Sequence, residues 1–163
     1  MTPEEKDARA EMYDTLSDLT AGLLGVEGSG QHMQPMAHHA EPETDTLWFV
    51  TSRNSDLVSA IGPDARAQFT ISAARRNFWA ATSGPISISD DAAKLDELWS
   101  SVSAAWFDEG RDDPDVCLLK MSLASASIWS TTGNPFLFGL EIARSNLTGD
   151  HKPDIGTHVV IDF

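Results

Sequence analysis

The stretch from Leu47 to Ile61, LWFVTSRNSDLVSAI, limits the fold of this chain more than any other. It begins as an apolar run of β-forming residues and then passes through the hydroxyl-rich turn 51–55. It continues with the spacing of a helix at Leu57, Val58 and Ile61. The sequence therefore predicts a strand that leads through small polar residues into a short helix.

A turn of this kind is a candidate anion site. A helix N-terminus offers free N–H groups and a partial positive charge, and Thr51, Ser52 and Ser55 add hydroxyl donors. The same residues also fit an ordinary helix cap with Ser52 or Asn54 at the N-cap position. Capping turns are much commoner than phosphate sites, so the residues alone favour the cap and leave the anion site open.

Length and composition predict one globular domain. The chain has 163 residues, of which 41% are hydrophobic and 8% aromatic. We expect a single domain over residues 1–163, with an N-terminal helix in 1–25 and a C-terminal helix and tail in 135–163. No apolar run is long enough to cross a bilayer, and Cys117 is the only cysteine, so no intrachain disulfide can form. The N-terminus is acidic and helix-forming, unlike a signal peptide, and we expect a cytoplasmic protein.

The formal net charge of −14 argues against two classes of partner. Nucleic acids and anionic membrane surfaces both require a basic face. A phosphorylated ligand would also need a local positive site to bind against this overall charge.

The first quarter of the chain predicts a helix over residues 2–25. Thr2, Pro3 and Glu5 form a capping box with proline at the first helical position. One apolar stripe follows at helical spacing, and we expect it to pack on the core. Its members are Ala8, Met12, Leu16, Leu19 and Leu23.

Alternating apolar residues predict strands along most of the remaining chain. The expected strands are 31–40, 47–51, 65–73, 78–88 with a bend at Gly84-Pro85, 116–123 and 124–129. The first two are expected to pair antiparallel, and the third and fourth form a hairpin. Antiparallel strands with a few helices at the margin indicate a small closed barrel, mainly β in class.

Two further helices are expected. One begins at Ser89 or Asp90 and runs to Trp106. Its predicted buried face consists of Leu95, Leu98, Trp99, Val102 and Trp106. The other covers 135–148 after an Asn134 cap. We expect the acidic loop 108–115 to be solvated and the tail 149–163 to be loop-like.

The residues do not indicate a metal site or a nucleophile. The histidines lack the spacing of metal ligands, and Cys117 lies in an apolar alternating strand, which predicts a buried thiol. No side chain stands out as a general acid or base, so no catalytic residue is assigned. Trp48, Trp79 and Trp129 each fall on a predicted strand, where core packing is the commonest use of an aromatic residue.

Four segments together resemble a known family. They are Gln34-Pro-Met36, the stretch 47–55, the segment 98–115 and Ala126-Ser-Ile-Trp129. In these segments the chain resembles the general stress protein branch of the pyridoxamine 5'-phosphate oxidase-like, FMN-binding split-barrel proteins. The resemblance runs over roughly residues 10 to 161 and implies a six-stranded antiparallel split β-barrel, mainly β with peripheral helices.

The resemblance also implies a function: a homodimer with FMN in clefts between the subunits and an oxidoreductase-like role. Thr51, Ser52 and Ser55 would then hold the phosphate. The backbone around Met36 and Phe49-Val50 would line the ring, and Gln34 is a further candidate cofactor-binding residue, at the position of an expected phosphate contact. Trp129 would approach the flavin from the partner subunit.

This sequence departs from the family pattern at its cationic positions. Gln34 stands where the family usually has Arg, Leu57 stands where it usually has Lys, and Asp56 adds a negative charge. Charge-assisted hydrogen bonds to phosphate are the strong ones, so losing both cations is expected to weaken FMN binding. Arg53, or Arg75 and Arg76, are the candidate replacements.

Two interpretations follow. The first is a flavin-dependent, oxidoreductase-like stress protein without pyridoxamine-phosphate oxidase activity, because the Arg-x-His pair expected after Trp129 is replaced by 130–135, STTGNP. The second is a non-catalytic dimeric binding module on the same barrel that has lost or exchanged its flavin.

Overall fold

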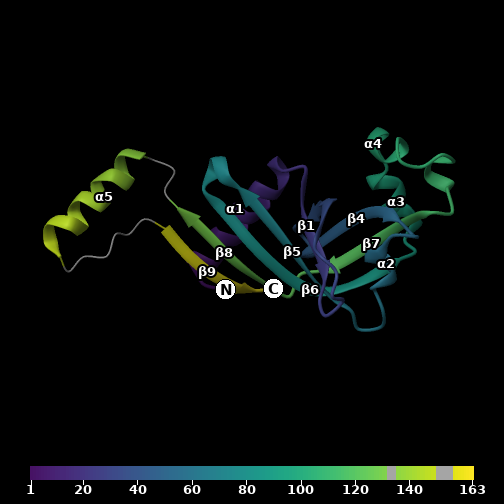
Figure 1. The fold of residues 1–163 in the computed structure, drawn as a ribbon, viewed down its shortest axis with the longest axis horizontal. Helices are drawn as coiled ribbons and strands as arrows, with labels where there is room; N and C mark the ends of the chain where they lie inside the picture. Colours follow the sequence, from purple (N-terminus) through teal and green to yellow (C-terminus); the bar gives the residue numbers. More distant parts are fainter. Residues whose placement is uncertain (132–134, 150–155) are drawn as a thin grey trace.

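The structure, a computed structural model, describes residues 1–131, 135–149 and 156–163. Its helices are α1 (Pro3–Asp18), α2 (Asp56–Ser59), α3 (Ala92–Leu98), α4 (Ser101–Ala104) and α5 (Pro135–Thr148), with short 3-10 turns η1 (Ala74–Arg76) and η2 (Gly110–Asp112). Its strands are β1 (Ala21–Val26), β2 (Gln34–Ala37), β3 (His39–Glu41), β4 (Thr46–Ser52), β5 (Arg66–Ala73), β6 (Phe78–Ser89), β7 (Val116–Ser122), β8 (Ser125–Thr131) and β9 (Gly156–Asp162). Figure 1 shows these strands as one curled sheet with helices at its margins.

The described strands form a nine-stranded antiparallel sheet that curls into a split barrel. The order of its main path is β2-β1-β5-β6-β7-β4-β3. Its two ends, β2 and β3, are consecutive in the chain and are separated only by His38. The bend at His38 joins these two ends without a ladder between them among the described strands, so the split barrel is confirmed, whereas the closed barrel and the count of six strands are corrected.

Strand β6 carries the second bend. Its first half pairs with β5 and β8, whereas from Ile86 onward it pairs with β7. The change of partner falls at Gly84-Pro85, where the sequence predicts a bend. A Cβ atom on Gly84 would lie 1.8 Å from the Ser122 carbonyl oxygen, so only glycine allows this close approach of the two backbones.

The core fills the barrel and extends under α1. Alternate residues of β4, β5 and β7 point inward, and the largest buried rings are Phe49, Phe69 and Phe78. Phe69 lies 5.3 Å from Phe49, centroid to centroid. Helix α1 contributes Met12 and Leu16 to the same core and packs against β9 and β3.

A polar anchor fixes α1 to the turn between β3 and β4. Asp45 accepts hydrogen bonds from the Tyr13 hydroxyl at 2.8 Å and from Arg9 Nη2 at 2.6 Å. Burial, followed by this hydrogen bond, raises the pKa of Tyr13 well above its ordinary value. At the other end of the helix, the ring Nε2 of His38 lies 2.8 Å from the Leu16 carbonyl oxygen. The barrel and its covering helix therefore form one packed unit.

The structure corrects the predicted N-terminal helix. The Thr2 capping box is present as predicted, but α1 ends at Asp18 and the chain then enters β1. Leu23 lies on β1 with 44% of its surface exposed and is not part of the buried stripe. The segment after Leu19 contains Gly22 and Gly25, which disfavour a helix, and it pairs with β5 and β2, so sheet contacts replace the last helical turns.

The predicted long helix after β6 was also wrong. Asp91 caps it in place of Ser89 or Asp90, and it breaks at Trp99 into α3 and α4. Trp106 is 80% exposed rather than buried. The apolar spacing is helical, but none of the described side chains in 92–115 is buried, so little tertiary packing holds one continuous helix together.

The C-terminal tail forms strand β9, which the sequence prediction missed. β9 pairs along its length with β8: Asp162 lies opposite Ser125 at one end, and Gly156 lies opposite Thr131 at the other. Val159 and Ile161 of β9 are buried in the core. The helix predicted at 135–148 is present as α5, whereas its Asn134 cap lies outside the described residues.

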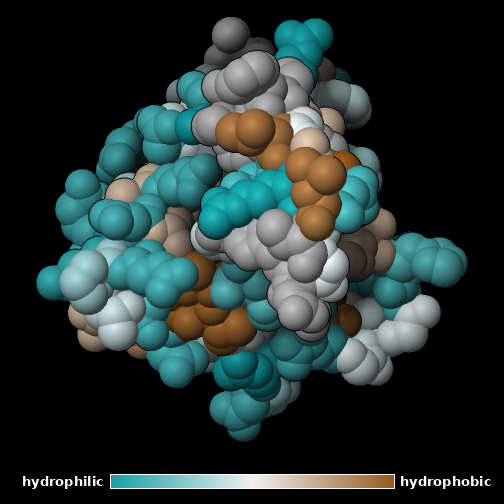
Figure 2. Space-filling model, turned by 90° about the vertical axis from the view of Figure 1, so that its left-hand side faces the viewer, coloured by the Kyte–Doolittle hydropathy of each residue, from teal (hydrophilic) through white to brown (hydrophobic). Residues whose placement is uncertain are grey.

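Helix α5 lies apart from the curled sheet, beyond β8 and β9 (Figure 1). Leu140 and Leu147 on it are 54% and 87% exposed. Figure 2, which views the molecule from that side, shows a mainly hydrophilic face with separate hydrophobic patches. In the part of the chain that the structure describes, no helix is long and apolar enough to span a membrane.

Candidate functional site

The hydroxyl turn forms as the sequence predicts. β4 ends at Ser52, the turn follows, and α2 begins at Asp56. Ser55 is the N-cap, and its hydroxyl oxygen accepts a hydrogen bond from the Val58 N–H at 3.2 Å. The cap is therefore Ser55 and not Ser52 or Asn54, and its hydroxyl oxygen is already engaged in holding the helix.

Asp115 closes the other side of the turn. The Ser52 hydroxyl donates to one carboxylate oxygen of Asp115 at 2.6 Å. The other oxygen accepts from the backbone N–H of Asn54 at 3.2 Å and from its side-chain amide at 2.7 Å. The Arg53 N–H donates to the Asp115 carbonyl at 2.7 Å. These bonds to the charged form, led by the one from Ser52, lower the pKa of the Asp115 carboxyl.

This arrangement corrects the prediction of a solvated acidic loop. The register of β4 with β7 pairs Ser52 with Val116, so the residue before β7 must lie beside the end of β4. The backbone of Asp115 is held in addition by a hydrogen bond from its N–H to the Asp113 carboxylate at 2.9 Å. Hydrogen bonds thus hold the end of the acidic loop against the turn.

A cleft of about 430 Å³ opens beside the turn, and we call it the turn cleft. One wall comes from β2 and β4, and the other from the segment around α4. Its lining residues are Pro35, Met36, Ala37, Val50, Thr51, Ser52, Ser103, Trp106, Phe107 and Asp115. The volume falls within the range of small-molecule sites, and the aromatic pair Trp106 and Phe107 gives it an apolar side opposite Met36 and Val50.

The turn cleft brings together some of the predicted site residues. Met36, Val50, Thr51 and Ser52 line it. Gln34, Phe49, Arg53, Ser55 and Trp129 do not line it. The Phe49 side chain is fully buried inside the barrel, because β4 alternates and Val50 takes the outward position.

The expected replacement cations lie elsewhere. Arg53 Nη2 donates to the Val116 carbonyl at 3.3 Å, and the side chain borders a different hollow, beside Arg111. Arg76 pairs with Asp14 and Asp18 of α1. Arg75 lies in the same turn η1, away from the cleft lining. Among the described residues that line the turn cleft there is no Lys, Arg or His.

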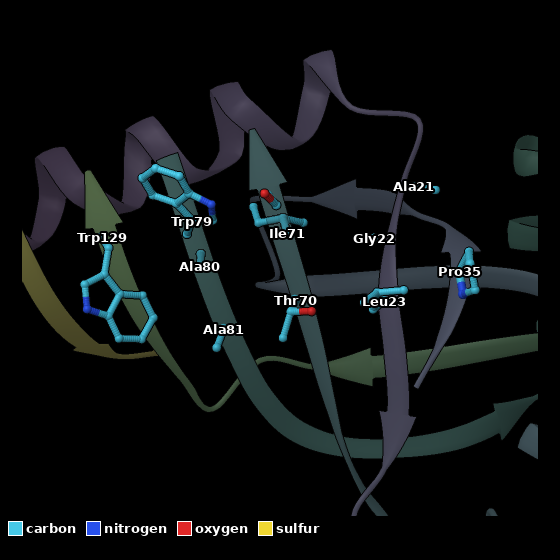
Figure 3. A pocket seen from close by; sticks show the side chains of 11 residues that line it. Ala21, Gly22, Leu23, Pro35, Thr70, Ile71, Trp79, Ala80, Ala81 and Trp129 are labelled. Atoms are coloured by element: carbon cyan, nitrogen blue, oxygen red, sulfur yellow. The ribbon is translucent and has the colours of Figure 1, made fainter. Parts of the chain in front are cut away.

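Trp129 belongs to a second hollow, of about 470 Å³, which we call the tryptophan hollow. It lies on the outer face of β1, β5, β6 and β8. Trp79 and Trp129 pair across β6 and β8 at one end, and Leu23 and Pro35 lie at the other (Figure 3). Trp129 stacks on His158 at 4.7 Å, and His158 bonds the Ser127 hydroxyl at 2.7 Å. Both tryptophans stay about two-fifths exposed, at 39% and 42%.

Sequence reasoning missed the far wall of the turn cleft. Trp106 was predicted on the buried face of the helix and Asp115 in the solvated loop, and Ser103 and Phe107 were assigned no individual role. One signal could have found Asp115: if 47–51 pairs antiparallel with 116–123, the start of the second strand adjoins the end of the first. No comparable signal marks Trp106, because its helical spacing indicates packing, or Phe107, which lies outside that apolar stripe.

The remaining candidates fall outside the cleft. Cys117 is fully buried, as predicted, and burial raises the pKa of its thiol. Within residues 1–131, 135–149 and 156–163, no group of at least three His, Cys, Asp or Glu residues could hold a metal ion.

Comparison with known proteins gives one family. The family described as pyridoxamine 5'-phosphate oxidase like matches residues 7–154. Among curated proteins no match was found.

Solved structures match over most of the chain. A protein described as general stress protein 26 from Jannaschia sp. CCS1 is 37% identical, with 97% of this chain and 99% of that chain covered and a TM-score of 0.80. A general stress family protein from Xanthomonas campestris pv. campestris is 29% identical, with 80% and 90% covered and a TM-score of 0.71. The general stress FMN/FAD binding protein from Xanthomonas citri is 28% identical, with 77% and 89% covered and a TM-score of 0.70.

Proposed function

This chain belongs to the pyridoxamine 5'-phosphate oxidase-like family, among its general stress proteins, and we propose that it binds a flavin in the turn cleft and has an oxidoreductase-like role. One observation carries the proposal: the cleft joins the β4 turn, with Val50, Thr51 and Ser52, to the aromatic pair Trp106 and Phe107. The Xanthomonas citri relative, named as an FMN/FAD binding protein, supports it.

The cleft residues fit a planar aromatic ring. Met36 and Val50 offer a flat apolar wall on the two strands, and Trp106 and Phe107 can cover the opposite side. Thr51 and the backbone beside it offer hydrogen-bond groups along one edge. The cationic groups that would hold an FMN phosphate are missing from the described lining.

The flavin would supply the redox chemistry, and the protein would hold and orient the ring. The described residues around the cleft include no histidine, and we assign no general acid or base. The proposal excludes pyridoxamine-phosphate oxidase activity, because Trp129 is followed by Ser130 and Thr131 where the substrate-binding Arg-x-His pair is expected. The buried free thiol of Cys117 suits a reducing compartment, and we propose a cytoplasmic location.

We propose a homodimer built on the tryptophan hollow. Leu23, Trp79 and Trp129 are large exposed apolar side chains gathered on one sheet face. Such a patch suits a second copy of the chain, and a partner in this position would bring its own Trp129 toward the flavin. Trp129→Asp should convert the dimer to a monomer in light scattering after gel filtration, and an unchanged mass would remove this face from the interface.

The second function, a binding module that has lost or exchanged its flavin, is favoured by one observation. Asp115 places a carboxylate on the turn where the phosphate of FMN is expected.

The visible spectrum separates the two functions. A purified protein with flavin absorbance, or an apo form that quenches riboflavin or FMN fluorescence at micromolar concentration, supports flavin binding. A colourless protein that binds neither ligand overturns the flavin proposal and favours the binding module without flavin. Turnover can then be sought with a nicotinamide reductant and a dye acceptor.

A further inference from the structure

We infer that the turn cleft selects a flavin without a terminal phosphate, because Asp115 takes the position of the anion. This inference rests on the proposed flavin site and specifies its ligand class: a ring compound of the riboflavin type, with a neutral hydroxylated tail.

The first argument is occupancy of the donors. The Ser52 hydroxyl and both N–H groups of Asn54 are directed at the Asp115 carboxylate, at 2.6 to 3.2 Å. A phosphate would have to take the same donors. Of the other two hydroxyls in the turn, Ser55 accepts from the Val58 N–H and can still donate, but it does not line the cleft, which leaves Thr51 there.

The second argument is charge. A phosphate monoester carries about −1.5 to −2 charges at neutral pH. Asp115 lines the cleft and Asp56 opens α2 beside it, and the described lining contains no cation to balance them. The Arg53 guanidinium donates to the Val116 carbonyl, and Arg53 borders a different hollow.

The third argument is the size of α2. It spans Asp56–Ser59, a single turn, so it aligns few peptide dipoles toward the cleft. Its first turn also contains Asp56, whose negative charge opposes a second anion there. The helix therefore does not compensate for the absent cations. A neutral ribityl tail avoids this repulsion, and its hydroxyls can donate to the Asp115 carboxylate.

The experiment is a fluorescence titration of the apo full-length protein with riboflavin and FMN in parallel. Wild type should bind riboflavin about tenfold more tightly than FMN, which corresponds to about 1.4 kcal/mol. Asp115→Asn keeps the shape and removes the charge, and it should reduce this ratio about tenfold through tighter FMN binding. Asp108→Asn removes one charge from the same acidic loop at a residue that does not line the cleft, and should leave the ratio unchanged.

Salt provides a readout that does not depend on a variant. Raising ionic strength screens charge repulsion, so FMN binding by wild type should strengthen with salt while riboflavin binding stays constant. A wild type that prefers FMN, or an Asp115→Asn variant with an unchanged ratio, overturns the inference and leaves the flavin proposal intact. Binding of neither ligand to wild type or to Asp115→Asn overturns both.

Discussion

The two walls of the turn cleft are built in different ways. The wall formed by β2 and β4 belongs to the barrel, where β4 pairs with β3 and β7 and β2 pairs with β1, and both strands contribute side chains to the core. The opposite wall comes from residues 92–115, which we call the covering segment. None of its described side chains is buried.

Charges, in place of apolar packing, hold the covering segment. Lys94 Nζ lies 2.7 Å from Glu41 Oε1, and Arg111 pairs with Asp96 and donates to the Ala92 carbonyl. The Lys94 bond, with those from Thr44 and Trp48, lowers the pKa of Glu41 to about 2. The Lys94–Glu41 pair is partly buried and the Arg111–Asp96 pair is more exposed; ion pairs near the surface contribute about 1 kcal/mol or less, so the segment is attached weakly to the barrel. The barrel therefore determines the stability of the fold, whereas substitutions in the covering segment can change ligand binding with little effect on stability.

Hydrogen exchange should show the largest contrast. Amides of β4, β5 and β6 should open only with global unfolding, at about 5–15 kcal/mol, whereas amides of the covering segment should open at close to zero. Exchange measured by mass spectrometry checks this. Equal protection of the two regions would break the comparison.

A cavity in the barrel should cost the most among single substitutions. Phe69 is fully buried and lies between Phe49 and His38, at 5.3 and 5.4 Å between ring centroids. Phe69→Ala should lower the free energy of unfolding by about 3–5 kcal/mol in urea titrations. A loss of less than about 1 kcal/mol would show that the barrel core collapses around the gap.

Acidification should weaken the barrel through His38. Its ring is buried, Nε2 faces the Leu16 carbonyl, and Nδ1 has no hydrogen-bond partner in the described structure. Burial lowers its pKa below the ordinary value of 6.5, as it does for the neighbouring His39. The unfolded chain therefore binds more protons, and stability present above pH 6.5 is lost as the pH falls toward the folded-state pKa.

The effect is at most about 1.4 kcal/mol per pH unit for one proton. His38→Gln keeps a donor for the Leu16 carbonyl and does not titrate, so its unfolding free energy should fall less between pH 7 and 5. Parallel pH curves for the two proteins would remove His38 from the acid response.

Removal of Trp106 should have the smallest effect on stability. Its side chain is 80% exposed at the edge of the cleft, so Trp106→Ala should change the free energy of unfolding by no more than about 0.5 kcal/mol. Loss of an aromatic contact with the ring should nevertheless weaken riboflavin binding about 2- to 10-fold. Unchanged affinity would show that the ring does not reach the covering segment.

The sequence determined the barrel and the turn. Alternation in β5 places one apolar face inward, and a half-buried strand has only one register that satisfies it, whereas the apolar runs that begin β4 and β7 indicate strands buried on both faces. The Thr2 capping box and the step from β4 into α2 are also local, because each depends on residues within a few positions of one another.

Only the tertiary structure decided what lies opposite the turn. Asp115 is 63 residues from Ser52 and reaches it through the pairing of β4 with β7, which neither segment encodes alone. Trp106 has the helical spacing of a buried residue, yet it is 80% exposed, and together with Phe107 it lines a cleft and not a core. Residue type and spacing indicate which side chains of a segment can be buried. The arrangement of the strands in the tertiary structure determines whether another element covers them.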